Sequence, residues 1–383
     1  MKLLDPLNQI QRREAKVVYY QYASFSNKQL RHMETSEEYK RQKEWSVKAL
    51  AEIENLTQGM AGAKSQVELE DLRRQKEKAL RLLEADEKNL KEHEAAVRSF
   101  LQQAVSMYAH YMETSNNLDQ EVAVRFCGLW FAHFDSEVAA ESVRHALPKI
   151  SSHKLLFLSH QLTARLGSSN ESERRSQAFL KQLVEGMCTF HPFHSLFQVL
   201  TMRGLTTDSK IEKKSSDNSQ RRRDEARRIV EAVRLKFKDG FLGRPNRFME
   251  LIEESFTAYV EWARYPIKPT RPKSGNFYPI PKGIALYKWT WDGRSRIDKP
   301  QPLCVPVVTS DIPIEMDGKY LDIPSIQWYE RRYTVAGGVH VPKITLCVDT
   351  LGRQHRQMVC DTRLFLFCLH LLFTALVQRR GCG

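Results

Sequence analysis

The spacing of hydrophobic residues changes twice along the chain, which divides it into a helical part, a proline-rich part and a strand-like part. Residues 34–111 lack proline and are rich in Glu, Lys, Arg, Gln and Ala, a composition that favours helix over many turns. Two glycines within residues 57–62 interrupt the run, so we expect two antiparallel helices. The second carries one narrow apolar stripe, formed by Leu69, Leu72, Leu80, Leu83, Leu90, Val97, Leu101 and Tyr108.

This stripe has two interpretations. Spacings near seven also fit the seam of a free-standing coiled coil, but Asp86, Glu87 and Glu94 interrupt it. We therefore favour helices that pack in a helical-repeat scaffold. Residues 118–200 support this interpretation, because their helical segments are shorter and more apolar, with Trp130 and Phe131 as expected core anchors, although no strict internal period is present.

Residues 208–223 are polar and basic, which predicts an exposed loop. Lys213, Lys214 and the arginines at 221–223 also fit a nuclear-import signal or a contact to a phosphate backbone, and the net charge of +13 favours nucleic-acid encounter. No aromatic residues alternate with the cations to stack on bases, so we favour a solvated loop and expect no direct nucleic-acid binding. Helical spacing resumes at residues 227–237 and 247–262.

Nine of the fifteen prolines lie between residues 265 and 313, which excludes helix there and predicts a linker. Trp289 and Trp291 are expected to hold this linker against the helices; an exposed, extended recognition segment is the alternative. Residues 303–314 alternate in the manner of a strand, and Asp317-Gly318 predicts the turn after it.

Three short apolar runs follow, at residues 326–335, 343–348 and 355–359, and they predict strands joined by turns. Gly337, Gly338 and Pro342 punctuate the first connection. A hairpin that presents backbone N–H groups and a lysine suits a nucleotide triphosphate, and Lys343 is expected to supply the positive charge. An ordinary β-meander is the alternative, since a Gly-Gly turn is common.

Composition narrows the class of protein. With 383 residues, of which 42% are hydrophobic, the chain is long enough for one large core or two domains. Its seven cysteines are scattered, which argues against a disulfide framework and for a reducing compartment. The histidines 153, 160, 191 and 194 have no carboxylate or cysteine at ligand spacing, so we expect no metal site. The first residues turn polar at once, which argues against a secretory leader.

The last segment is unusual. Residues 364–377 are almost continuously apolar and are flanked by arginines, yet they are shorter than the roughly 20 residues that span a bilayer. We favour a translated intron or a frameshift as their origin and expect no membrane association; a tail anchor is the alternative.

The segment AGGVHVPK at residues 336–343, with the strand that follows it, resembles the opening of the catalytic domain in the phosphatidylinositol 3-kinase-related protein kinases, and the ATM branch most closely. Motifs upstream resemble the FAT region of that branch, a helical-repeat scaffold, and occur in the same order. They are residues 25–27 with 36–39, 126–130, 154–158 with 161–167, and 191–197. The resemblance covers roughly residues 15–359.

The resemblance implies a mainly α fold in four parts. Residues 1–263 form a FAT-like α-solenoid scaffold, 264–302 a proline-rich linker, 303–360 an incomplete, β-rich kinase small lobe, and 361–383 an apolar tail unlike the family. It assigns the loop over the ATP phosphates to Gly337, Gly338, Val339, His340, Val341, Pro342 and Lys343. The family lysine at the end of the third strand falls at Cys360, and no catalytic residue is assigned.

The resemblance also implies an activity. Relatives of this kind are ATP- and magnesium-dependent kinases of the DNA-damage response and telomere maintenance, which phosphorylate serine or threonine before glutamine. They act in the nucleus, with telomeric chromatin as one site, on protein substrates, through a double-strand-break sensor complex, and the full-length proteins form homodimers. The family's catalytic loop lies beyond the matched strands, so we expect this polypeptide to be inactive and to bind neither ATP nor magnesium productively. The alternative is a non-enzymatic helical scaffold; a phosphoinositide kinase is disfavoured by the FAT-like region.

Overall fold

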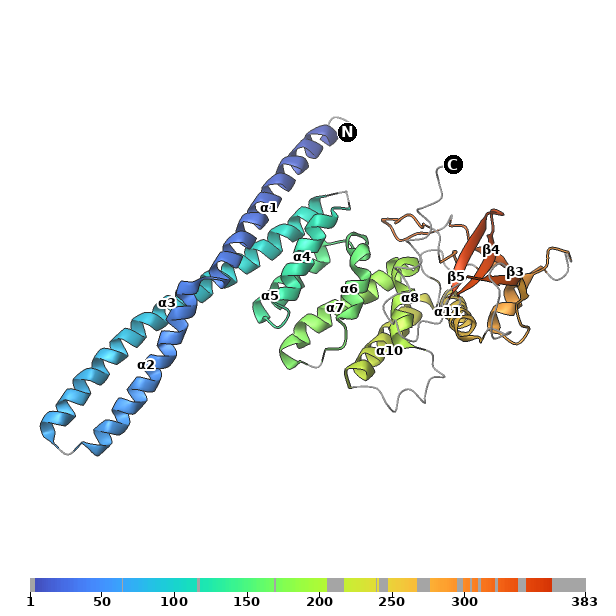
Figure 1. Ribbon diagram of the computed structural model, residues 1–383. Coiled ribbons are helices and arrows are strands. Elements are labelled where there is room, and N and C mark those ends of the chain that lie inside the picture. Colours follow the sequence, from blue (N-terminus) through green and yellow to red (C-terminus); the bar gives the residue numbers. More distant parts are fainter. Residues whose placement is uncertain are drawn as a thin grey trace. The chain divides into compact units, whose positions relative to one another are not determined.

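The structure, a computed structural model, describes residues 4–63, 65–115, 118–168, 170–204, 217–238, 240, 247–266, 276–294, 299–303, 305–308, 311–320, 323–336 and 342–359. The chain divides into two compact units: residues 1–155 with 170–179, and residues 156–169 with 180–383. Helices dominate both, and the second also holds one small sheet (Figure 1), which confirms the predicted mainly α fold.

In the first unit, two helices that follow one another in the chain pack antiparallel along a third, longer helix. Helices α1 (Leu4–Glu34) and α2 (Glu37–Gly62) follow one another along α3 (Gln66–Thr114), as Figure 1 shows. The Ser36 and Ser65 side chains cap the starts of α2 and α3 by accepting hydrogen bonds from the Tyr39 and Val67 amides. The two predicted antiparallel helices are therefore confirmed, but the break predicted at residues 57–62 is wrong, because α2 continues to Gly62 and α3 begins at Gln66.

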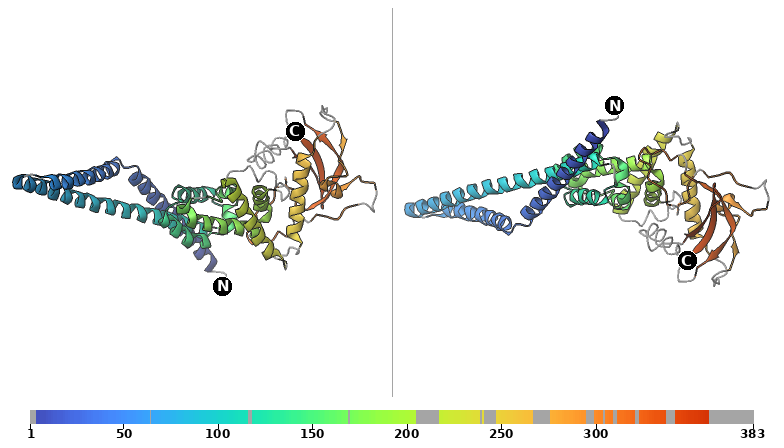
Figure 2. Two further views of the ribbon diagram at one scale, coloured as in Figure 1. Left: turned by 90° about the horizontal axis from the view of Figure 1, so that it is seen from below. Right: turned by 90° about the horizontal axis from the view of Figure 1, so that it is seen from above.

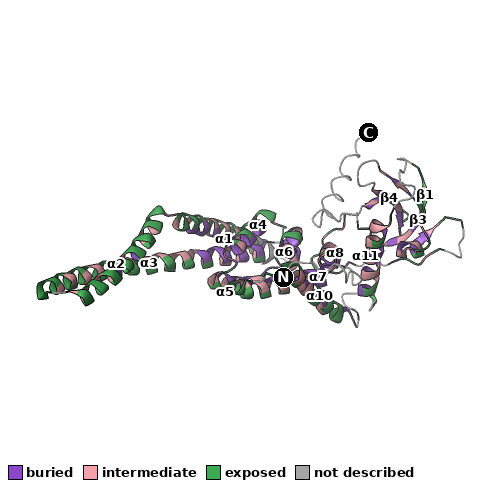
Figure 3. Ribbon diagram, turned by 60° about the horizontal axis from the view of Figure 1, so that its bottom comes forward, coloured by how far each residue is buried: buried purple, intermediate pink, exposed green. Residues whose placement is uncertain are grey.

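Burial along this pair is uneven. In α2 only Ser46 is buried, and α3 buries Leu83 alone until Leu101, after which Ala104, Val105 and Tyr108 follow (Figure 3). The preference for helical-repeat packing is thus correct for the C-terminal half of α3. Its N-terminal half instead forms a two-helix arm with α2, closer to the coiled-coil alternative.

The C-terminal half of α3 is covered by short helices, α4 (Gln120–Ala132) and α5 (Glu137–Ala146), followed by the 3-10 turns η1 (Leu147–Lys149) and η2 (Ser152–Leu158). Trp130 is fully buried, as expected, while its neighbour Phe131 is only half-buried. The buried Lys154 ammonium donates to the Met112 and Ser115 carbonyls at the end of α3, which supplies orphan helix carbonyls with a donor.

The second unit begins with short helices. They are α6 (Ser159–Ala164), α8 (Pro192–Arg203), α10 (Asp217–Phe237) and α11 (Phe248–Arg264). Between α6 and α8 the chain forms η3 (Glu171–Glu173), which belongs to the first unit, and α7 (Arg174–Phe190), of which residues 174–179 belong to the first unit and the rest to the second. The loop predicted over residues 208–223 is wrong for its second half, because α10 starts at Asp217. Within α10, i,i+3 ion pairs such as Arg227–Asp224 stabilise a polar sequence as helix. Lys213 and Lys214 lie outside the described residues.

The sheet follows α11. Its strands are β1 (Tyr278–Pro279), β2 (Thr290–Trp291), β3 (Ile326–Val335), β4 (Lys343–Asp349) and β5 (Gln354–Val359), in the order β1-β3-β4-β5 with β2 beside β3. The three predicted strands at the C-terminal end are confirmed. Both views of Figure 2 show α11 against one face of the sheet. In the described part of the chain β5 pairs on one side only, with β4.

The proline-rich segment is more structured than predicted. It contains β1, β2 and the 3-10 turn η4 (Ala285–Trp289), so the exclusion of helix was too strict. Trp291 meets Trp328 of β3 edge to face, at 4.8 Å between ring centroids and 76° between ring planes, and so lies against the sheet rather than the helices. The strand predicted at residues 303–314 is reduced, among its described residues, to a single bridge between Pro306 and Ser325. The turn at Gly318, whose φ is +71°, is confirmed.

Within the described ranges, no helix combines the length and apolar character needed to cross a membrane. The apolar segment at 364–377 lies outside those ranges.

Candidate functional site

The predicted phosphate loop is closed at its base by regular strand pairing. Val335 of β3 lies opposite Lys343 of β4, and the Ala336 amide donates to the Pro342 carbonyl at 2.9 Å. The loop's central residues, Gly337 to Val341, lie outside the described residues. Their role as a phosphate loop therefore stays a prediction.

The side chain of Lys343 contacts the end of helix α11. It is buried, with 4% of its surface exposed, and its Nζ donates to the Ala263 carbonyl in the last turn of α11 at 2.9 Å. The same Nζ lies 5.2 Å from the centre of the Trp262 ring. In this structure the ammonium group is therefore directed at the helix end, and the role of Lys343 at a nucleotide stays a prediction.

A buried polar cluster joins α11 to the sheet. The Tyr259 hydroxyl lies 2.5 Å from the Tyr329 hydroxyl and donates to Gln357 Oε1 at 3.0 Å. Burial raises the pKa of both tyrosines well above their ordinary range and the pKa of the Cys347 thiol to about 12, so all three stay protonated. These groups fix the sheet on α11 and carry no reactive form near neutral pH.

The face of the sheet away from α11 is less buried. Strand side chains alternate between faces, and Lys343, Thr345 and Gln357 are buried on the α11 side. Ile344 and its cross-strand partner Met358 are half-buried on the other side. This gives the hairpin one apolar, partly open face, the kind of surface that suits a flat aromatic base.

The turn between β4 and β5 is organised by Asp349, which is 1% exposed. Its carboxylate accepts hydrogen bonds from the Leu351 and Arg353 amides, from Arg353 Nε at 2.8 Å and from His355 Nε2 at 2.9 Å. Burial alone raises the pKa of Asp349, but the hydrogen bonds from His355 and Arg353 lower it to about 2. The turn thereby sets the register of β5.

Two of the four candidate histidines meet at the start of α8. His191 Nδ1 lies 2.7 Å from the Tyr320 hydroxyl, and Phe193 and His194 also contact the Tyr320 ring. Burial lowers the pKa of His194, so this imidazole is neutral near pH 7. In the part of the chain that the structure describes, no group of three or more His, Cys, Asp or Glu side chains is arranged to hold a metal ion.

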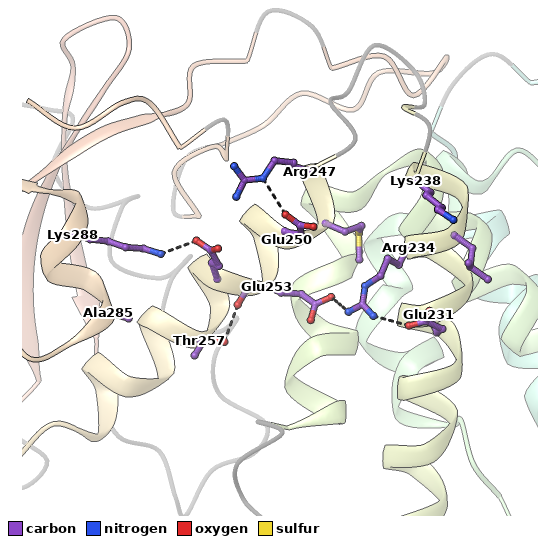
Figure 4. A pocket seen from close by; sticks show the side chains of 12 residues that line it. Glu231, Arg234, Lys238, Arg247, Glu250, Glu253, Thr257, Ala285 and Lys288 are labelled. Atoms are coloured by element: carbon purple, nitrogen blue, oxygen red, sulfur yellow. Dashed lines mark hydrogen bonds and ion pairs between the residues drawn. The ribbon is translucent and has the colours of Figure 1, made fainter.

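A groove of about 880 Å³ lies between α10, α11 and η4 (Figure 4). Glu253 at its centre accepts hydrogen bonds from Arg234 and from Arg203, the latter 9% exposed and 2.8 Å away. Arg234 also pairs with Glu231. Opposite charges neutralise one another here. The groove is therefore lined by ion pairs that connect the helices, and it is not an anion-binding site.

Several of these residues were missed by the sequence analysis. Asp349 carried a usable signal, because Asp-Thr-Leu-Gly is a turn sequence in which aspartate binds amides two residues on. Tyr259 and Gln357 carried none, since their contact joins residues 98 positions apart.

No protein-family model matches the chain. It is 26% identical over 347 residues to the serine/threonine-protein kinase TEL1 of Cryptococcus neoformans, with 89% of this chain and 10% of the relative covered. It is 26% identical over 299 residues to the serine-protein kinase ATM of Sus scrofa, with 74% of this chain and 9% of that protein covered. The chain thus spans about a tenth of the length of the curated relatives it matches.

Solved structures agree on the fold. The open conformation of CtTel1 matches with a TM-score of 0.66 at 24% identity, covering 91% of this chain and 12% of that one. A structure described as the FAT and kinase domain of CtTel1 matches with a TM-score of 0.64 at 24% identity, covering 90% and 21%.

Proposed function

We propose, from the premise that the chain is homologous to a segment of the Tel1 and ATM serine/threonine-protein kinases, that it forms the end of such a kinase's scaffold and the start of its small lobe. The homology confirms the family that the sequence motifs indicated. In this proposal residues 1–263 form the FAT-like scaffold, and residues 264–302 link it to the ATP-binding lobe, which begins with residues 303–360. Residues 361–383 form a tail unrelated to the family.

The observation that carries the proposal is the closed β3–β4 hairpin, with α11 on one face of the sheet and a partly open apolar face on the other. ATP would lie against the open face, with its phosphates near residues 337–342. Backbone amides, and not Lys343, would then supply the donors. Magnesium ligands would come from a large lobe, as in protein kinases generally.

Cys360 stands where the family resemblance places a phosphate-contacting lysine. A neutral thiol cannot replace an ammonium group as a partner for phosphate oxygens. Loss of one such electrostatic contact costs about 10²–10³ in rate. We therefore propose that a polypeptide with this sequence does not transfer phosphate, although it derives from a kinase that does.

A chimaera tests both statements. Residues 15–360 would replace the matched segment of a Tel1 kinase, once with Cys360 and once with the change Cys360→Lys, and phosphorylation of a Ser-Gln peptide would be measured with MgATP. We expect the Cys360→Lys chimaera to be active and the Cys360 chimaera to be at least about 10²-fold slower. Inactivity of both folded chimaeras would overturn the small-lobe assignment; equal activity would overturn the role of position 360.

A second candidate function, a protein-interaction scaffold, is favoured by one observation. On α2 the side chains of Trp45, Val47 and Leu50 are 66%, 64% and 53% exposed. Two related structures are described as a Tel1 dimer with C2 symmetry and a Tel1 butterfly symmetric dimer, so we propose a second copy as the partner. Sedimentation should show dimers that Trp45→Glu abolishes and that Leu351→Glu, at an exposed position in the turn between β4 and β5, leaves intact.

The wider roles follow from the homology alone. We propose nuclear localisation, action in DNA damage and at telomeres, and Ser/Thr-Gln substrates met through a break-sensor complex for the whole kinase. A fluorescent fusion of this chain should be nuclear; a fusion confined to the cytoplasm would contradict the localisation.

A further inference from the structure

The first residue of β4 reaches across to a helix end. Lys343 follows directly after Pro342, whose carbonyl closes the hairpin base, and its Nζ donates to the Ala263 carbonyl 80 residues earlier in the chain. The contact joins the strand that leaves the predicted phosphate loop to the last turn of α11.

The helix end needs such a donor. α11 ends at Arg264, so the Ala263 carbonyl is one of the last four, which have no partner within the helix. A cation at this end also interacts favourably with the helix dipole. The Tyr265 amide donates a hydrogen bond to the Trp262 carbonyl, and the Lys343 side chain donates one to the next carbonyl, that of Ala263.

The surroundings of Lys343 hold it there. The residue is 4% exposed, its ammonium lies 5.2 Å from the centre of the fully buried Trp262 ring, and the donor distance of 2.9 Å is ordinary. Withdrawing the ammonium would leave the Ala263 carbonyl without its charged donor. The lysine is therefore engaged before any ligand arrives.

We infer that Lys343 is a positioning residue that fastens the base of the β3–β4 hairpin to the last turn of α11, and that it is not a ligand of phosphate. The part of this inference that concerns phosphate rests on the proposed function. One consequence is that the hairpin base and the end of α11 open together.

Hydrogen–deuterium exchange on the full chain tests the anchor. Lys343→Met removes the charge and the donor at similar length, and we expect exchange at residues 258–265 and 342–347 to rise together, by about tenfold or more. Lys343→Arg keeps both charge and donor and should restore protection. Lys288→Met is the matched control, because Lys288 also bridges to α11, through Glu254, and lies over a tryptophan ring, but it is half-exposed.

A second arm uses MgATP on the unmodified chain. If Lys343 stays anchored, saturating MgATP leaves residues 258–265 as protected as before. If Lys343 moves to a phosphate, MgATP raises exchange there as Lys343→Met does, and the inference is overturned. Unchanged exchange in folded Lys343→Met would overturn the anchor itself. A chain that binds no nucleotide, as expected without the large lobe, leaves the first arm to decide the anchor, and the chimaera with Cys360→Lys then serves for the MgATP comparison.

Discussion

Replacement of Asp349 by asparagine gives a test whose size follows from the structure. The variant keeps an oxygen for the Leu351 and Arg353 amides but loses the charge that faces Arg353 Nε and His355. The pKa of Asp349 falls from 3.8 to about 2, which at 1.36 kcal/mol per unit corresponds to about 2.4 kcal/mol. The Arg353 side chain is 58% exposed, so solvent screens part of this, and we expect about 1–2 kcal/mol.

The pH dependence has a definite sign. A carboxyl group whose pKa is lowered in the folded state contributes stability that is complete above its unfolded value of 3.8 and is lost as pH falls toward 2. Asp349→Asn should therefore be destabilising at pH 7, and the difference from the natural sequence should shrink below about pH 5.

Urea unfolding at pH 7, 5 and 3.5, followed by circular dichroism, measures this difference. Asp317→Asn is the control, because Asp317 also accepts an amide hydrogen bond in a turn, from Lys319, but its side chain is 58% exposed. We expect that control to change the free energy of unfolding by less than about 0.5 kcal/mol. About three quarters of the deficit should remain at pH 3.5 and about a sixth at pH 2, so a fourth titration at pH 2 completes the series. Equal stability of Asp349→Asn and the natural sequence at pH 7, or a deficit as large at pH 2 as at pH 7, would refute the reasoning.

Three further substitutions probe side-chain contacts that join segments distant in the sequence. Lys154→Met should lower the free energy of unfolding by about 1–3 kcal/mol in urea titrations, because two carbonyls at the end of α3 lose their donor. Tyr320→Phe removes only the hydroxyl group that contacts the buried His191. It should lower the free energy of unfolding by about 1–2 kcal/mol and raise hydrogen exchange at residues 311–320. Unchanged exchange there would contradict the contact. Glu253→Gln leaves Arg203 buried without a charge partner. It should lower the thermal midpoint of unfolding and reduce the free energy of unfolding by about 3 kcal/mol.

The sequence predicted local structure better than long-range contacts. The three strands from Ile326 to Val359 were recognisable because β-branched and aromatic runs alternate with turn residues. The start of α10 was missed because its polar composition matches that of a loop, and its ion pairs appear only once helix places them three residues apart.

The candidate site shows the same limit. The position of the loop over residues 337–343 followed from its glycines and from family resemblance. The direction of the Lys343 side chain depends on Ala263, 80 residues away, and the burial of Gln357 depends on Tyr259. Such pairings arise from packing of α11 on the sheet, for which no short sequence pattern exists.

Among the described residues β5 has a strand on one side only, and its other side affects how the polypeptide behaves in solution. A strand edge offers backbone donors and acceptors to any other strand, which promotes aggregation. Here the edge strand carries positive charge, since Arg356 of β5 is exposed, while the charge of Arg353 is balanced by Asp349. Two copies therefore repel each other at low ionic strength, whereas salt above a few tenths molar screens that repulsion. Concentrated, salty stocks of this chain should precipitate where dilute, low-salt ones stay clear.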